Sequence, residues 1–292
     1  MVWRKGWILF CLWWGSLVQA AEPPTLTLLT ELWPPYVMRL DDGSLGGADL
    51  ELARTVLKRM GYQTTVKVLP WKRVLQEARF QRGDAVVDVF FEERRLEWLH
   101  YPDEPLSQSG EVIFFPFSKP VDYQSLESLK GLRIGTQADY AYGEPFLTSA
   151  LFTRVPMTGE SNMIKQLHLM MAGRLDAVVM NQIVGRYLLK GQGLQDQVGH
   201  SEKMVTESNR NFLAFTHRPG NERLAYQFSL ALKAFKQTPE YQALLTRYGS
   251  DPVLKRRYRA AITLLCACSH FVALHRQWGI MPAQKASWLN FI

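Results

Sequence analysis

The sequence predicts an α/β protein of two similar lobes joined by two hinge strands. Segments with the alternation of a β-strand and segments with the 3.6-residue period of an amphipathic helix follow one another from about residue 25 to residue 249. The pattern restarts after Lys119-Pro120, and each half contains a helix followed by a related motif, G-D-A-V-V (83–87) or G-R-L-D-A-V-V (173–179). The strand–helix–strand–helix–strand order of the first half predicts a parallel sheet.

The first half supplies strands and two amphipathic helices. Its strand segments either alternate apolar and polar residues or are continuously apolar, as in a buried strand. Each helical segment has apolar residues three or four positions apart and ends at a glycine. The expected strands are 25–30, 64–69, 84–91 and 111–117, and the expected helices end at Gly61 and Gly83.

The second half repeats this organisation and then returns to the first. The expected elements are a short helix at 125–131, a strand at 132–136, helices at 140–152 and 161–175, a strand at 176–180 and a helix at 181–191. A strand at 211–217 leaves this half, and the two helices that follow it, 222–237 and 238–249, have no sheet of their own. They are expected to pack on the first lobe, so that two strands, near 111–118 and 211–216, connect the lobes and form a hinge beside a cleft.

These patterns predict five segments along the chain. They are a signal peptide at 1–20, the first part of lobe 1 at 21–115, lobe 2 at 116–211, a return segment to lobe 1 at 212–249, and a basic, apolar C-terminal extension at 250–292.

The first twenty residues have the features of a secretory signal peptide. Arg4 and Lys5 precede a largely apolar run, Gly6 to Val18, and Val18-Gln19-Ala20 places small side chains before a cleavage site. The run is shorter than the roughly 20 residues that span a bilayer, which disfavours a membrane anchor. We therefore expect cleavage after Ala20 and export of the mature protein.

The distribution of charge and the absence of known catalytic motifs exclude several classes of function. The formal net charge is +7, but the excess lies in the two terminal segments, and residues 21–249 carry no net charge. A neutral body lacks the clustered charge of a nucleic-acid interface. Cysteine occurs only at Cys11, Cys266 and Cys268, so the body depends on neither a disulfide nor a catalytic thiol. Since no nucleophile motif, zinc spacing or nucleotide fingerprint is found, we expect no catalytic residue, metal or cofactor.

Seven motifs follow one another between residues 25 and 249. They are T-E-L-W-P-P-Y (30–36), D-G-S-L-G-G-A-D-L-E-L-A (42–53), W-K-R-V-L (71–75), G-D-A-V-V (83–87), E-R-R-L-E-W-L-H-Y-P-D-E-P-L (93–106), L-K-G-L-R-I-G-T (129–136) and G-R-L-D-A-V-V-M-N (173–181). Each motif alone is weak, but in this order and at this spacing they resemble the type II periplasmic solute-binding proteins of family 3, which capture amino acids and similar small polar solutes for ABC importers.

The resemblance implies a ligand site in the cleft. Aromatic rings from Tyr36 and Trp71 would wall the ligand. An arginine after the G-D-A strand would hold a ligand carboxylate with two charge-assisted hydrogen bonds. Two arginines qualify: counting back from Tyr101-Pro102 favours Arg95, whereas the E-R pair itself favours Arg94.

Two positions and one segment depart from the family pattern. Asp88 stands where the family usually carries a hydroxyl, and an acid there would repel a carboxylate or attract a ligand cation. Asn181 replaces the aspartate that often binds the α-ammonium group. In segment 137–143, Tyr140 and Tyr142 take the place of a Gly-Ser/Thr loop and could close over a ligand. The expected ligand-binding residues are Glu31, Tyr36, Trp71, Asp88, Arg94, Arg95, Asp139, Tyr140 and Asn181.

The resemblance implies a monomeric binding protein that closes on a small polar solute, of the amino-acid type, and presents it to the membrane permease of an ABC importer. Two alternatives remain open. The same fold hosts periplasmic dehydratases that act on prephenate-like substrates (cyclohexadienyl or arogenate dehydratases), and a ligand-sensing module would use the same closure.

Overall fold

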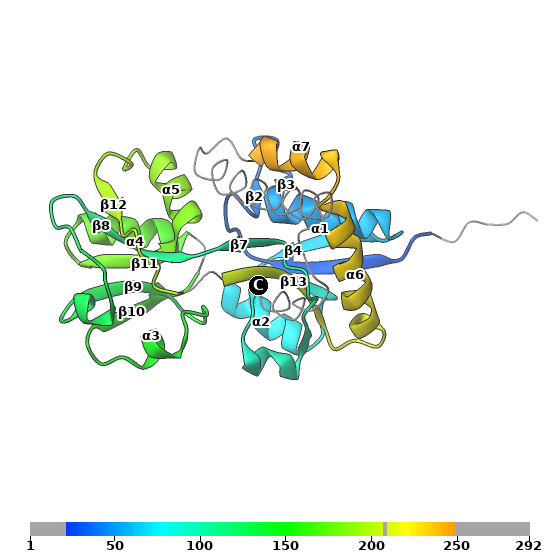
Figure 1. Ribbon diagram of the computed structural model, residues 1–292, viewed down its shortest axis with the longest axis horizontal. Coiled ribbons are helices and arrows are strands. Elements are labelled where there is room, and N and C mark those ends of the chain that lie inside the picture. The colour runs from blue at the N-terminus through cyan, green and yellow to red at the C-terminus, as the bar shows by residue number, and fades with distance from the viewer. Residues whose placement is uncertain (1–21, 160, 207–208, 249–292) are drawn as a thin grey trace, which may run out of the picture.

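The structure is a computed structural model that describes residues 22–159, 161–206 and 209–248, which form two lobes lying side by side (Figure 1). Each lobe is built on its own β-sheet, and the predicted two-lobed α/β fold is confirmed. The predicted signal peptide at 1–20 and the extension at 250–292 lie outside the described residues. Within the part of the chain that is described, no helix is long and apolar enough to span a membrane.

The first sheet combines parallel and antiparallel pairing. Its strands are β1 (Thr25–Thr30), β4 (Gln63–Val68), β5 (Ala85–Phe90), β6 (Leu99–His100), β7 (Ser107–Ser109) and β13 (Asn209–Thr216). They lie in the order β4-β1-β5-β13-β6, and β7 pairs with the far end of β13. As predicted, β1 is parallel to β4 and β5, whereas the returning strand β13 is antiparallel to β5.

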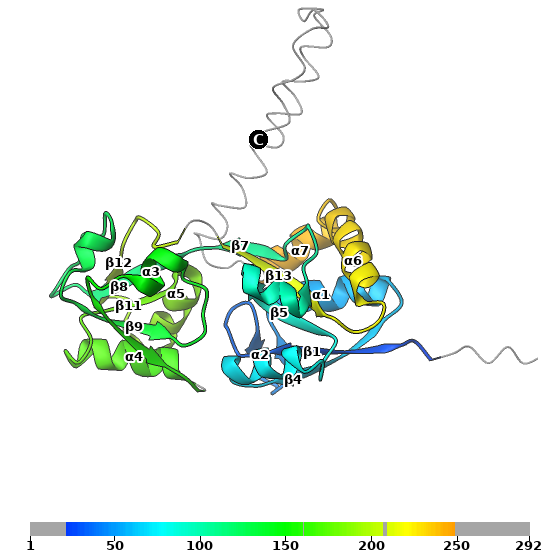
Figure 2. The same cartoon turned by 90° about the horizontal axis from the view of Figure 1, so that it is seen from below.

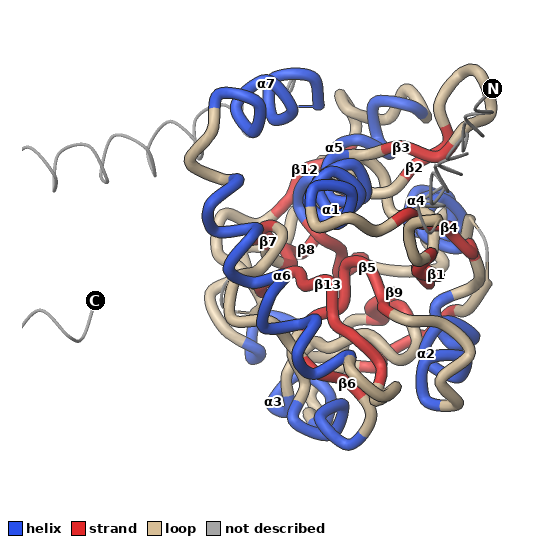
Figure 3. The backbone as a smooth tube through the Cα atoms, turned by 90° about the vertical axis from the view of Figure 1, so that its right-hand side faces the viewer, coloured by secondary structure: helices blue, strands red, loops and turns tan. Residues whose placement is uncertain are grey.

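Helices cover both faces of the first sheet. The elements around it are the hairpin β2 (Met38–Arg39) and β3 (Leu45–Gly46), α1 (Ala48–Arg59), α2 (Trp71–Arg79), the short 3-10 helix η1 (Glu93–Glu97), α6 (Asn221–Phe235) and α7 (Pro239–Tyr248). Figure 3 shows α1 and α6 on one side of the strands and α2 on the other. Consecutive residues of β1 point to opposite faces of the sheet: Leu28 packs with α1 and α6, and Leu29 packs with α2.

The second lobe has the same layered organisation. Its elements are β8 (Glu111–Pro116), the 3-10 helix η2 (Leu126–Leu129), β9 (Arg133–Gln137), α3 (Glu144–Thr148), β10 (Thr153–Met157), α4 (Asn162–Met171), β11 (Ala177–Asn181), α5 (Gln182–Gly191) and β12 (Val198–His200). The sheet order is β10-β9-β11-β8-β12. On β11, Val178 packs with α4 and α5, and the next residue, Val179, packs with the α3 side of the lobe. The continuous apolar run of this strand is therefore buried on both faces.

The chain crosses between the sheets at two places (Figure 2). It leaves the first sheet at Gly110, since β7 pairs with β13 and β8 pairs with β11 in the second sheet. It re-enters the first sheet at Asn209, where β13 begins. Both changes precede the boundaries predicted at residues 115 and 211, because an apolar strand pattern does not show which sheet the strand joins. The limits of the lobes as folding units stay a prediction.

The segment at 140–152 differs from its expected single helix. Only Glu144–Thr148 is helical, because Gly143 has a left-handed φ of 82° and Pro145 lies at the start of the helix. The residues before Gly143 are left as an irregular loop, and this loop carries Tyr140 to the boundary between the lobes.

Candidate functional site

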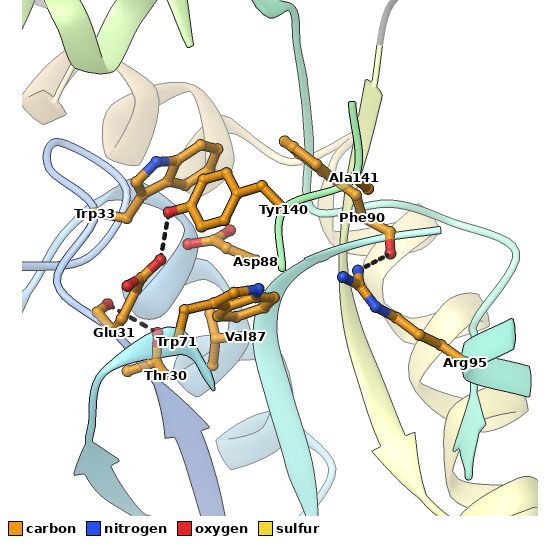
Figure 4. A pocket seen from close by; sticks show the side chains of 10 residues that line it. All are labelled: Thr30, Glu31, Trp33, Trp71, Val87, Asp88, Phe90, Arg95, Tyr140 and Ala141. Carbon is orange, nitrogen blue, oxygen red and sulfur yellow. Dashed lines mark hydrogen bonds between the residues drawn. The ribbon is translucent and has the colours of Figure 1, made fainter. Parts of the chain in front are cut away.

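A pocket lies between the lobes at the carboxyl ends of β1 and β5, the edge of a parallel sheet where ligands of α/β proteins usually bind. Figure 4 shows its walls. The lining residues are Thr30, Glu31, Trp33, Trp71, Val87, Asp88, Phe90 and Arg95 from the first lobe and Tyr140 and Ala141 from the second. The free space among them is about 20 Å³, because the side chain of Tyr140 extends into the pocket. A solute therefore has to displace this ring.

Aromatic side chains form the walls, but not the predicted pair. Trp71 lines the pocket and meets the Tyr140 ring edge-on at 5.9 Å between centroids. Tyr36 does not line the pocket; it is 2% exposed and lies behind Trp33, with the two rings stacked at 4.8 Å. Trp33 provides the second wall instead. The motif T-E-L-W-P-P-Y contains both aromatics, and nothing in its spacing shows which of them turns inward.

Glu31 and Tyr140 join the two lobes. The Tyr140 hydroxyl donates a hydrogen bond to the Glu31 carboxyl, and the backbone N–H of Trp71 reaches the same carboxyl. Burial raises the pKa of Glu31 to about 7, although both hydrogen bonds act in the opposite direction. Both residues were predicted for the site, and the structure brings them into contact.

The two candidate arginines have different environments. Arg95 is 2% exposed and lines the pocket: its Nε lies 3.1 Å from the Glu92 carboxylate, and its Nη1 donates to the Phe90 carbonyl at 2.9 Å. Its Nη2 donates across the cleft to the Asp139 carbonyl at 3.1 Å. Arg94 is exposed, pairs with Glu92, and does not line the pocket. The structure thus places Arg95 in this pocket, whereas Arg94 lines a neighbouring hollow between the lobes; the role of Arg95 as a carboxylate anchor stays a prediction.

A β-bulge turns Asp88 into the pocket. The register between β5 and β13 shifts between Phe212 and Ala214, where β5 has one extra residue. Asp88 has a φ of 59° there, in the left-handed region that non-glycine residues rarely adopt. Its neighbour Val87 also lines the pocket, whereas a regular strand would turn the two side chains to opposite faces.

The remaining two predicted residues do not present their side chains to the pocket. The Asp139 side chain is exposed, but its backbone carbonyl accepts hydrogen bonds from Trp71 Nε1 at 3.2 Å and from Arg95 across the lobe boundary. Asn181 is buried at the start of α5, where its Oδ1 accepts from the N–H groups of Ile183 and Val184. This is a helix N-cap, which accounts for Oδ1, while Nδ2 of Asn181 is buried without a hydrogen-bond partner among the described residues.

We expect the closed arrangement to weaken as the pH rises from about 4.5 to about 7. The Glu31 carboxyl has a pKa of about 7 in the closed form against an ordinary value of 4.5, so closing takes up a proton in this interval. Closure is therefore fully favoured below pH 4.5 and declines by up to about tenfold per pH unit towards pH 7. Small-angle X-ray scattering measures the change as a larger radius of gyration. The Glu31→Gln variant stays neutral at position 31, so its radius of gyration should increase less over this pH range than that of the wild-type protein; an identical pH profile in both proteins would contradict this assignment.

No group of three or more His, Cys, Asp or Glu side chains that could hold a metal ion is found in the described parts of the chain.

Comparison with known proteins places this architecture in a family. Residues 26–251 match the model for bacterial extracellular solute-binding proteins, family 3. The L-cystine-binding protein TcyJ of Escherichia coli (strain K12) is 24% identical over 241 residues, which cover 81% of this chain and 87% of that protein. The arginine-binding periplasmic protein of Mannheimia haemolytica is 24% identical over 238 residues, covering 79% and 93%.

A solved substrate-binding protein of an amino acid ABC transporter superposes with a TM-score of 0.66 at 18% sequence identity, covering 78% of this chain and 100% of that one. This likeness supports the two-lobed fold, and the family match extends over most of the sequence, as the seven motifs predicted. The chain belongs to family 3 of the bacterial extracellular solute-binding proteins.

Proposed function

We propose that this protein captures a small polar solute of the amino-acid type between its lobes in the periplasm and presents it to the permease of an ABC importer. One observation carries the proposal: the pocket is walled by side chains of both lobes, with Tyr140 facing Trp33 and Trp71. A solute placed there contacts both lobes only when they are closed. The names of the relatives, an L-cystine-binding and an arginine-binding protein, agree with a solute of this class.

Closure follows from the two crossings of the chain. A rotation about Gly110 and Asn209 moves the lobes relative to each other: the core clusters within each lobe stay intact, and Trp33, Tyr36 and Phe90 separate from the second-lobe side chains with which they pack. The solute favours the closed form by its contacts with the second lobe, and the permease would recognise that form. We further infer that the protein works as an exported monomer without a cofactor.

The test is a screen of the purified mature protein against the twenty common amino acids, cystine, polyamines and dicarboxylates. A solute at 100 times its dissociation constant stabilises the folded protein by about 2.7 kcal/mol, which a thermal-shift assay detects readily. Scattering should show a change in lobe closure with the same solute. If no member of the panel raises the melting temperature or changes the radius of gyration, the proposal is wrong.

A matched pair of aromatic substitutions locates the binding. Trp71→Ala removes a pocket wall and should weaken binding by about 0.5–1.5 kcal/mol beyond the loss of buried area. Tyr226 lies on α6, is 60% exposed and does not line the pocket, so Tyr226→Ala should bind normally. Equal affinities of the two variants would place the ligand elsewhere.

One observation favours a second candidate function, an enzyme on the same scaffold. With a pKa raised to about 7, the Glu31 carboxyl is suited to donating or accepting a proton near neutral pH. We propose a binding protein rather than an enzyme because the relatives named above are binding proteins. Product analysis by mass spectrometry after incubation with each stabilising solute decides between the two: the binding protein returns every solute unchanged.

A further inference from the structure

Asp88 brings a buried carboxyl group into the pocket. Both of its carboxyl oxygens are buried, and among the described residues neither accepts a hydrogen bond from a backbone N–H, a hydroxyl or a basic side chain. Figure 4 shows the group projecting from β5 towards the space between Trp33, Tyr140 and Trp71. The bulge that aims it there requires a left-handed φ, so the strand adopts an unfavourable conformation to place this acid in the cleft.

The neighbour of Asp88 is a second buried carboxyl, that of Asp49 on α1. Asp49 is 3% exposed and accepts a hydrogen bond from the Ser107 hydroxyl, and its carboxyl contacts that of Asp88. Burial raises the pKa of both groups, and the repulsion between the two charges raises the pKa of Asp88 further. Two contacting carboxyls in such a site do not readily ionise together, so burial and repulsion favour the form in which the pair holds one proton between them.

The described residues around Asp49 and Asp88 supply little positive charge to the pocket. On α6, Lys236 attracts Asp49 but is held by the Glu104 carboxylate and the Pro105 carbonyl. Among the described residues, Arg95 is the one basic side chain lining the pocket, and it shares the Glu92 carboxylate with Arg94. The other charged or titratable groups that the structure describes facing the pair or the pocket add no positive charge; they are Glu31, Tyr140 and, on α7, Tyr241.

We propose that the cleft anchors its solute by a positively charged nitrogen, which binds the carboxylate of Asp88 between the rings of Trp33 and Trp71. The ligand class is an organic cation, an amine or guanidinium compound, and a carboxylate held by Arg95 is not required. Aromatic faces beside a carboxylate suit such a group, because the ring face and the carboxylate both attract a cation. The incoming cation displaces the shared proton of Asp49 and Asp88 to solvent, so the charge of the pocket is conserved.

This proposal rests on the proposed capture of a solute in the cleft. The probes below test the cation site and solute capture separately. Agmatine and putrescine carry cationic nitrogen and no carboxylate, and arginine carries both. Succinate and N-acetylglycine carry carboxylate and no cation. By isothermal titration calorimetry at pH 7, at least one cationic probe should bind the full-length mature protein, and the two carboxylate-only probes should not.

The Asp88→Asn variant keeps the size of the side chain and tolerates a left-handed φ. It should weaken binding of the cationic probe by roughly 10- to 100-fold, the range for a charged hydrogen bond, without lowering the melting temperature. Asp103→Asn, at an exposed acid of the same lobe outside the pocket, is the matched control and should bind normally. If Asp88→Asn does not unfold cooperatively, Asp88→Gly, which suits the φ of 59°, takes its place.

Proton release gives an independent readout. In two buffers of different ionisation enthalpy, binding of the cationic probe should release close to one proton from the wild-type protein and none from Asp88→Asn. Unchanged affinity in the Asp88 variant overturns the cation site. So does binding of succinate or N-acetylglycine alone, which leaves solute capture standing. If no probe binds and the amino-acid screen is also negative, both proposals fail.

Discussion

Arg95→Ala is expected to lower the free energy of unfolding by about 3 kcal/mol. The Arg95 side chain is 2% exposed, and its removal takes one donor from the Glu92 carboxylate and one from the Phe90 carbonyl, which keep Arg94 and the Tyr101 hydroxyl as their remaining donors. Breaking a buried ion pair from one side typically costs about 3–5 kcal/mol, and this loss should fall near the lower end because Arg94 still pairs with Glu92, whose side chain is 16% exposed. Urea denaturation followed by circular dichroism measures the change.

Arg94→Ala is the matched control, because Arg94 is adjacent and pairs with the same carboxylate. Its side chain is 65% exposed, so the substitution should change the free energy of unfolding by less than about 0.5 kcal/mol. Equal losses in the two variants would show that Arg95 is not the buried partner of Glu92. The ligand affinity of Arg95→Ala is to be measured only on protein shown to be folded.

Gly47→Ala is expected to destabilise the first lobe by about 3 kcal/mol. Gly47 precedes α1 with a φ of 117°, and a Cβ atom there would lie 2.3 Å from the backbone oxygen of Tyr36. That oxygen accepts hydrogen bonds from the N–H groups of Asp49 and Leu50. The start of α1 therefore cannot shift away from Tyr36 without losing these hydrogen bonds. Overpacking typically costs about 1–3 kcal/mol, and the left-handed φ adds about 1–2 kcal/mol. The denaturation midpoint reports the sum.

Gly43→Ala separates the two causes. Gly43 also has a positive φ, 81°, but a Cβ atom added there would have no other atom within 4 Å among the described residues, so only the conformational cost of about 1–2 kcal/mol applies. If Gly43→Ala destabilises the protein as strongly as Gly47→Ala, close approach to Tyr36 is not what requires glycine at position 47.

Sequence periodicity predicted the two lobes because each sheet buries both faces and each helix buries one, so apolar spacing follows the core. Counting back from Tyr101-Pro102 favoured Arg95, because the helix η1 has a fixed length between β5 and β6. The structure places Arg95 in the pocket. Asp88 was recognised from its unusual residue type. Its orientation was not, since the bulge arises from the pairing of β5 with a strand more than a hundred residues away in the chain.

Trp33 and Asp49 were missed for physical reasons. In W-P-P-Y, the turn decides which ring faces the cleft, and both rings satisfy the same motif. Asp49 lies in the first turn of α1, where an acidic side chain is usually exposed and interacts favourably with the helix dipole. Its burial depends on Ser107 of β7, a contact between segments whose proximity only the folded chain establishes.

The ring of Tyr140 makes the second lobe an internal competitor of the solute. Because the ring is tethered to the protein, its effective concentration at the wall formed by Trp33 and Trp71 does not fall on dilution, and for short tethers such concentrations are in the millimolar range. A free solute at micromolar concentration must therefore compete with a group that is always present. The dissociation constant for the solute then measures the replacement of the Tyr140 ring by the solute. Its value depends on the loop at 137–143 as well as on the residues that contact the solute.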